Sequence, residues 1–244
     1  MDVSARERTL DGFLGGRLTI AQPKRGFRAG HDTVLLAAAV PAQAGSRVLE
    51  LGSGAGIAAL CLAARVPDVE VLGIEIDPGL VELARDNAAR NGVAGRARFE
   101  TGDVLQFAVR SGFDHVFFNP PFYPASGQES PHPARDRAMR DADQTLAAWM
   151  RVGLSALKDR GTATAIVRAD RVSELLSAAE GLAATMFPLL PHAGEKPKRT
   201  IVQVTKGASG PLRNAAGLVL HEANGRNTEA AEAVLRHGAP LKLD

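Results

Sequence analysis

Hydrophobic and polar residues alternate along most of this chain in a pattern that switches repeatedly between strand and helix. The middle of the chain predicts strands at 47–51, 69–76, 96–100 and 113–118, with helices at 57–65 and 78–91 and a short helix from about residue 103. After residue 140 the pattern predicts helices at 142–157, 171–180 and 228–237 and strands at 162–168, 183–189, 200–206 and 218–221. Because strands alternate with helices, we expect an α/β fold with a mostly parallel sheet covered on both faces.

The N-terminal segment predicts a β-hairpin. Residues 10–14 and 17–22 are two short runs with strand character, and Gly15-Gly16 between them suits a tight turn. Pro23 ends the second run, because proline cannot donate to a sheet ladder.

A short helix is expected over residues 32–40, with Asp32 or His31 near its N-cap. The alternating pattern begins soon after this helix and continues to the end of the chain. We therefore expect an N-terminal hairpin appendage at residues 1–30 and a single domain at residues 31–244.

Composition narrows the protein class only slightly. The chain has 244 residues, and none of its apolar runs approaches the roughly 18 residues of a membrane span. The N-terminus lacks the basic start and apolar run of a secretory signal, so we expect a cytoplasmic protein without a membrane partner. The lone Cys61 lies in an apolar run and is interpreted as a packing residue. Its spacing to the six histidines does not suit a metal, so no metal is predicted.

A glycine-rich loop joins the strand 47–51 to the helix 57–65. Its glycines, Gly52, Gly54 and Gly56, permit a tight turn and let a ligand approach the backbone closely. A dinucleotide-binding fingerprint would place its third glycine at position 57, which is isoleucine here. The loop therefore predicts a cofactor site and counts against NAD.

Acidic residues follow the neighbouring strands. Glu75 lies 23 residues beyond Gly52 (75 − 52), close to the spacing of a ribose-binding carboxylate, whereas Asp77 before Pro78 is well placed as a helix N-cap. Asp103 could accept a hydrogen bond from an adenine amine or cap a helix, and the two roles are compatible.

These segments resemble the class I S-adenosylmethionine (SAM)-dependent methyltransferases. The resemblance lies in Glu50 to Gly56, Gly73-Ile74-Glu75 and Gly102-Asp103. It implies a Rossmann-like seven-stranded sheet with an antiparallel last strand, and SAM as the methyl donor. In this family the glycine loop receives the methionine and ribose portion of SAM, and we expect Glu50 to order that loop more than to bind directly.

The tetrapeptide Asn119-Pro120-Pro121-Phe122 directly follows the strand 113–118, at the sheet edge where ligands of open α/β folds bind. An exocyclic purine amine is a poor nucleophile because its lone pair is delocalised into the ring. The Asn119 side-chain oxygen and the Pro120 carbonyl could accept both N–H protons and favour a pyramidal nitrogen. Phe122 could stack on the base. The structural alternative is that Asn119 caps a turn and the prolines end a strand.

The tetrapeptide also occurs in guanine N2- and protein glutamine N5-methyltransferases, so other segments must indicate the substrate. Three segments resemble the bacterial valine-tRNA adenine N6-methyltransferase family: residues 14–18 with Gln22-Pro23, residues 30–36, and a tail with Lys196 to Arg199, His221-Glu222 and Asn224-Gly225. The resemblance implies methylation of an adenine beside the anticodon. It also implies that the Asp32-Thr33 segment closes over the cofactor.

RNA contacts are expected from an aromatic and a basic group. Tyr123 could extend the stacking platform, which would reach only an unstacked or flipped base. Lys196, Lys198 and Arg199 gather without an intervening acid, although the net charge is only +2. A solvated charged surface is the alternative. The partner predicted is tRNA or another RNA.

Overall fold

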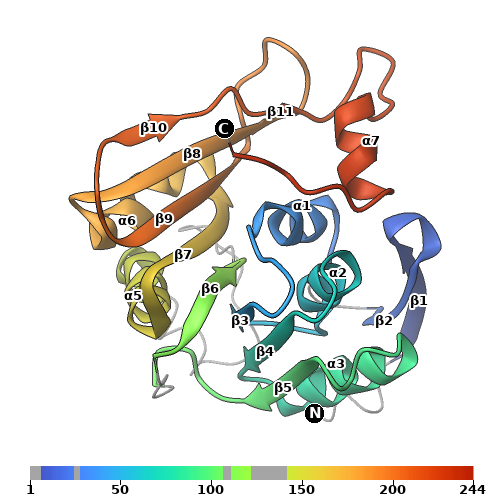
Figure 1. The fold of residues 1–244 in the computed structure, drawn as a ribbon. Helices are drawn as coiled ribbons and strands as arrows, with labels where there is room; N and C mark the ends of the chain where they lie inside the picture. The colour runs from blue at the N-terminus through green and yellow to red at the C-terminus, as the bar shows by residue number, and fades with distance from the viewer. Residues whose placement is uncertain (1–6, 25–27, 107–110, 122–141, 244) are drawn as a thin grey trace.

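The computed structural model describes residues 7–24, 28–106, 111–121 and 142–243. Its main sheet has nine strands: β3 (Arg47–Leu51), β4 (Glu70–Glu75), β5 (Ala97–Thr101), β6 (Phe113–Phe118), β7 (Leu157–Arg168), β8 (Leu182–Leu190), β9 (Arg199–Ser209), β10 (Leu212–Asn214) and β11 (Leu218–Val219). Figure 1 shows this sheet running through the middle of the molecule, with helices on both of its faces.

The order of the strands is β10-β8-β9-β7-β6-β3-β4-β5, with β11 also paired to β8. Strands β3, β4, β5, β6 and β7 pair in parallel with one another, and β9 runs antiparallel to both β7 and β8. The expected sheet of seven strands with an antiparallel last strand is therefore confirmed. The short strands β10 and β11 extend it beyond β8, and β10 has no counterpart among the predicted elements.

The helices are α1 (His31–Ala39), α2 (Ile57–Arg65), α3 (Pro78–Arg90), α5 (Ala142–Ala156), α6 (Val172–Leu176) and α7 (Glu229–Leu235). Side chains of α1, α2 and α3 fill one hydrophobic cluster and those of α5 and α6 another. The strands between them alternate: Val48 and Phe117 face the first cluster, and Leu49 and Phe118 face the second. No helix among those described is long and apolar enough to cross a membrane.

Several predicted boundaries agree with the structure because glycine or proline marks them. Strands β3 and β6 and helix α2 have the predicted bounds, and Asp77 is the N-cap of α3, with Gly79 N–H donating to its Oδ1 at 2.9 Å. As predicted, His31 and Asp32 lie near the N-cap of α1. Gly30 occupies that position without a side-chain hydrogen bond, and Asp32 lies in the first turn.

Two predictions were wrong in detail. The single helix expected at 171–180 is the short α6 flanked by two 3-10 turns, η3 (Ala169–Arg171) and η4 (Ser177–Ala179). Strand β7 begins at Leu157 instead of residue 162, because its first part is paired through Phe113 across an irregularity in the ladder.

The predicted hairpin is present as β1 (Arg8–Phe13) and β2 (Leu18–Pro23), joined through the 3-10 turn η2 (Leu14–Gly16). Its inner residues, including Leu18 and Ile20, are buried in the cluster that α1, α2 and α3 share. The hairpin thus shares a core with the α/β region, and its separation as a unit of residues 1–30 stays a prediction.

Candidate active site

The carboxyl ends of four parallel strands bring the predicted site residues into a row. In the pairing of β3 with β6, Leu51 lies opposite Phe118, so Gly52 and Asn119 follow from adjacent positions. The chain order reverses between these two strands, since β4 lies on the other side of β3. A crevice at such a reversal is where open α/β sheets bind ligands.

The row continues across the next two strands. Leu51 pairs with Ile74, which places Glu75 beside Gly52, and Glu75 pairs with Thr101, two residues before Asp103. The residues therefore follow one another along the sheet edge from Asn119 through Gly52 and Glu75 to Asp103.

The glycine loop has a backbone that only glycine adopts readily. Gly52, Gly54 and Gly56 have φ values of 68°, 55° and 82°. A Cβ on Gly52 would lie 2.7 Å from Cη2 of Trp149, whereas one on Gly54 would meet nothing within 4 Å. The loop is therefore packed tightly at Gly52 and open at Gly54, where a ligand can approach the backbone.

The Glu75 carboxylate holds the loop in this shape. It is 9% exposed, and its two oxygens accept hydrogen bonds from Gly54 N–H at 2.9 Å and Asp77 N–H at 3.0 Å. A carboxylate oxygen has two lone-pair sites, so Glu75 can still accept hydrogen bonds from a ligand.

Glu50 lies behind the loop. Its Oε2 accepts a hydrogen bond from Ala59 N–H in the first turn of α2 at 3.1 Å. Burial raises the pKa of the Glu50 carboxyl well above its usual value, the Ala59 hydrogen bond opposes this shift, and the charge of Glu75 adds to it. Glu50 therefore orders the start of α2, in surroundings whose burial raises the pKa of its carboxyl.

Two buried polar atoms near the row have no hydrogen-bond partner among the described residues. They are Oδ1 of Asn119 and Oγ of Ser53, the residue after Gly52. Buried polar groups are nearly always paired in native proteins, so such atoms suit contacts with a bound ligand. Pro120 is buried and Pro121 is exposed. Phe122 and Tyr123 lie outside the described residues, and their predicted stacking is not described.

Asp103 lies in a turn after β5. Its Oδ1 accepts a hydrogen bond from Leu105 N–H at 2.9 Å, which leaves Oδ2 available. The helix expected from about residue 103 falls partly on residues 107–110, which lie outside the described part of the chain.

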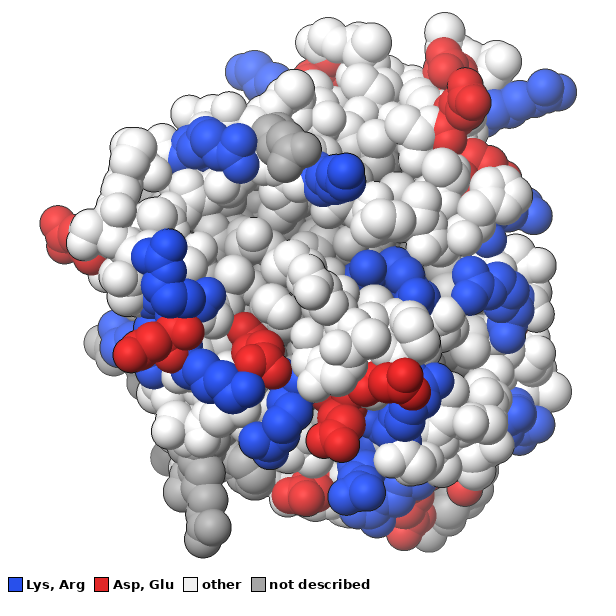
Figure 2. Space-filling view, viewed as in Figure 1, with Lys and Arg blue, Asp and Glu red and all other residues white. Residues whose placement is uncertain are grey.

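The basic segment 196–199 divides into two kinds of residue. Arg199 donates from Nε to Oδ2 of Asp32 at 3.0 Å, which joins the start of β9 to the first turn of α1. Lys196 and Lys198 are exposed and have no ion pair within the described residues. Figure 2 shows Lys and Arg side chains interspersed with Asp and Glu over the face in view, so binding of a polyanion there would depend on local groups.

Two structural residues were not apparent from the sequence. Asn87 of α3 is fully buried, and its side chain bonds Ala21 N–H at 2.8 Å and the carbonyls of Ala21 and Ala55 at 3.0 Å each. It thereby ties the hairpin to the glycine loop. Trp149 of α5 packs on Phe118 with ring centroids 5.9 Å apart and also closes over Gly52. An asparagine on the apolar face of a helix was the available signal for Asn87.

Cys61 is buried, and burial raises the pKa of its thiol to about 12, with the charge of Glu50 adding to the shift. The packing interpretation is therefore confirmed. Within the described ranges, no group of three or more His, Cys, Asp or Glu residues is arranged to hold a metal ion.

Comparisons with known proteins agree with this geometry. A family model described as "Methyltransferase small domain" matches residues 28–158. A tRNA1(Val) (adenine(37)-N6)-methyltransferase of Actinobacillus succinogenes is 28% identical over 80% of this chain and 84% of its own length. The protein of the same name from Bacteroides thetaiotaomicron is 29% identical over 82% and 86%.

Solved structures show the same fold. A crystal structure titled a predicted O-methyltransferase from Agrobacterium tumefaciens superposes with a TM-score of 0.71 and 25% identity, covering 86% of this chain and 98% of the other. A methyltransferase from Pyrococcus furiosus superposes with a TM-score of 0.60 at 16% identity, covering 78% and 89%.

Proposed function

Since the chain belongs to the methyltransferase small domain family and is a SAM-dependent methyltransferase, we propose that it methylates the exocyclic N6 amine of an adenine in tRNA. The observation that carries the proposal is the buried Oδ1 of Asn119, which has no hydrogen-bond partner among the described residues. Asn119 directly follows β6 and lies beside the glycine loop. The activity named for the Actinobacillus and Bacteroides relatives supports the choice of adenine and of a valine tRNA.

The described residues fit SAM. The backbone at Gly54 faces open space, and the Ser53 hydroxyl has no hydrogen-bond partner in the described part of the chain. Glu75 retains acceptor capacity for ribose hydroxyls, and Asp103 retains an oxygen for the adenine amine. Bound SAM supplies an electrophilic methyl group. In this proposal Gly52 and Gly56 shape the loop, and Glu50 orders α2 behind it without touching the ligand.

Asn119 and Pro120 act on the acceptor amine. Their oxygens accept its two N–H groups and favour a pyramidal nitrogen, so that the lone pair is freed from the ring. As the nitrogen gains positive charge, these hydrogen bonds strengthen, which is a contribution made in the transition state. An amide oxygen is too weak a base to keep a proton, so the proton lost by the nitrogen passes to solvent.

Guanine N2 and the glutamine side-chain amide are the alternative acceptors, because the tetrapeptide is shared with enzymes that modify them. Incubation with labelled SAM and separate pools of unmodified tRNA, rRNA and protein, followed by mass spectrometry of nucleosides and peptides, separates the three. We expect N6-methyladenosine from the tRNA pool, lost in Asn119→Ala. N2-methylguanosine as the only product, or label in protein, would contradict the proposal.

A further inference from the structure

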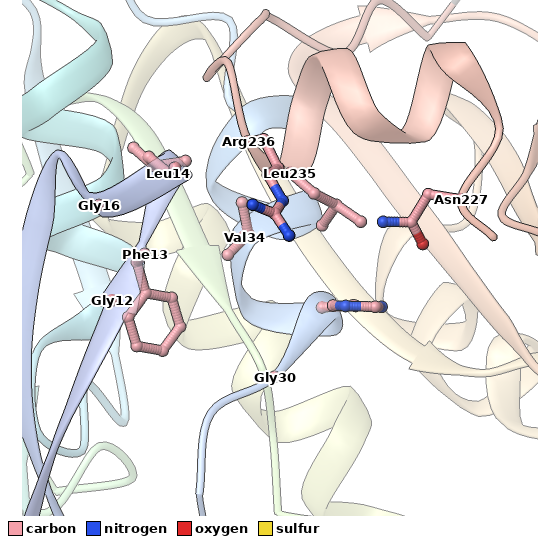
Figure 3. Close-up of a pocket in the computed structure, with 11 residues that line it drawn as sticks. Gly12, Phe13, Leu14, Gly16, Gly30, Val34, Asn227, Leu235 and Arg236 are labelled. Carbon is pink, nitrogen blue, oxygen red and sulfur yellow. The ribbon is translucent and has the colours of Figure 1, made fainter.

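The hairpin and the segment around α7 meet at a pocket whose lining includes none of the residues in the row from Asn119 to Asp103. It has a volume of about 450 Å³ and is formed by residues 12–16 of the hairpin, the start of α1, and residues at both ends of α7. Figure 3 shows Phe13 and Asn227 on opposite sides of it, with Arg236 between them. Small-ligand pockets span roughly 300–1,000 Å³, so this one is large enough for a single nucleoside.

The pocket walls are fixed by contacts between the two ends of the chain. A Cβ on Gly15 would lie 2.9 Å from the Arg236 carbonyl oxygen, so the hairpin turn packs directly on the end of α7. Arg17 donates to the carbonyls of Ala64 at 2.7 Å and His237 at 3.4 Å. A pocket held in this way exists before a ligand arrives, which reduces the entropy lost on binding.

The lining combines an apolar floor with polar groups that are already oriented. Val34 and Leu235 are buried, and Phe13 is partly exposed. Glu232 accepts from Nδ2 of Asn227 at 2.8 Å and pairs with Nε of Arg236 at 3.0 Å. These bonds leave the Asn227 Oδ1 and the terminal nitrogens of Arg236 without a side-chain partner among the described residues.

Three histidine rings lead from the pocket toward the basic segment. The ring of His31, which lines the pocket, lies 6.2 Å from that of His221, which in turn lies 5.8 Å from the ring of His192. His192 precedes the exposed Lys196 and Lys198 by a few residues. An RNA backbone held by these lysines would therefore pass close to the pocket mouth.

We propose that this pocket receives one unstacked nucleoside of the substrate RNA, distinct from the nucleoside that is methylated. The inference rests on the proposed function. The Phe13 ring can stack on any base, the Asn227 amide oxygen can accept a hydrogen bond from a base amine, and the Arg236 guanidinium can contact a phosphate or a base acceptor.

The test uses full-length valine tRNAs, each with a single abasic site in the anticodon loop, against the full chain and two variants, Phe13→Leu and Arg236→Gln. Phe13→Leu keeps an apolar side chain but removes the stacking face. Leu10→Ala in the same hairpin and Arg98→Ala on β5 serve as controls, because both side chains are exposed and lie outside the pocket. Affinity for tRNA, affinity for SAM and the rate of methylation are measured for each.

We expect one abasic position to weaken binding to the unchanged protein on the order of tenfold, the effect of losing one stacked base. The same abasic position should weaken the binding of tRNA to Phe13→Leu only slightly, since that variant has already lost the stacking contact. The affinity for SAM should stay unchanged. If each abasic site weakens Phe13→Leu as much as the unchanged protein, the pocket proposal is wrong. If the unchanged protein neither binds nor methylates tRNA, the proposed function itself is wrong.

Discussion

Asn119 has a side-chain oxygen that is buried and unpartnered within the described part of the chain. If this oxygen accepts a hydrogen bond from the target amine, Asn119→Ala removes a contact that is strongest in the transition state. We expect kcat to fall on the order of 10²- to 10³-fold, as when one oriented hydrogen bond at a reacting centre is lost. Single-turnover kinetics with tRNA measure this change.

The matched control is Asn214→Ala, because Asn214 is an exposed asparagine on β10. It should leave the rate unchanged. Titration of SAM distinguishes a catalytic from a cofactor role: an unchanged rate in Asn119→Ala, or a loss explained wholly by weaker SAM binding, would contradict the role assigned to the amide oxygen.

Glu50 is an acid whose folded-state pKa is raised, chiefly by burial. Below the pKa that Glu50 has in the unfolded chain, its carboxyl is protonated in both the folded and the unfolded state. As the pH rises above that value, ionisation of the carboxyl stabilises the unfolded state but not the folded state. Stability is therefore lost as the pH rises toward the folded pKa, by at most about 1.4 kcal/mol per pH unit. Glu50→Gln stays neutral and removes this dependence.

Between about pH 5 and pH 8, we expect the free energy of unfolding of Glu50→Gln to increase relative to that of the unchanged protein, so that the variant becomes the relatively more stable of the two. Urea unfolding without SAM at both pH values measures it. Glu222→Gln, at an exposed glutamate, should show no such change. A difference that does not vary with pH would mean that Glu50 ionises in the folded protein as it does in the unfolded chain.

At the scale of elements, two asparagines four residues apart, Asn87 on α3 and Asn91 at its C-cap, join the hairpin to the rest of the fold. Asn87 is fully buried and satisfies three backbone groups, while Asn91 bonds the N–H and carbonyl of Thr19 near solvent. Asn87→Ala leaves three buried groups unpaired, each costing about 1–3 kcal/mol, so we expect a loss of at least about 3 kcal/mol.

Asn91→Ala should cost less than about 1 kcal/mol, because water can replace its bonds. Urea unfolding followed by the fluorescence of Trp149, the sole tryptophan, compares the two variants. Weaker SAM binding is also expected for Asn87→Ala, since its bond to Ala55 supports the glycine loop. Equal losses in the two variants would show that burial at Asn87 is not decisive.

The sequence predicted those elements that local signals define. Helix α2 and strand β3 have the expected bounds because apolar periodicity and the glycines of the loop mark their ends. Strand β10 was missed because it has three exposed residues and forms only by pairing with β8. The pairing of Asp32 with Arg199 was not predicted, because the two residues are 167 positions apart along the chain. Long-range pairing of this kind leaves no local pattern.

The candidate site could likewise be predicted only in part from the sequence. The row of Asn119, Gly52 and Glu75 could be predicted, since carboxyl ends of adjacent parallel strands must lie together. The contact of Trp149 with Gly52 could not, because it depends on how α5 packs against the sheet. The meeting of the hairpin with residues near Arg236 likewise depends on the complete tertiary fold.

At the scale of the whole molecule, a net charge of +2 gives little general attraction for RNA, so its salt dependence should depend on a few residues. Lys196 and Lys198 are exposed, whereas Arg199 is held by Asp32. If each lysine neutralises one phosphate, replacing both with alanine should reduce the slope of log K against log salt by about 1.5. The double variant Arg90→Ala/Arg98→Ala removes the same charge from exposed sites on α3 and β5 and should leave the slope unchanged. Arg199→Gln should change the slope less than either lysine does, and should weaken SAM binding by releasing the start of α1. A slope that falls equally in the lysine and control variants would mean that overall charge, not the 196–199 segment, attracts the RNA.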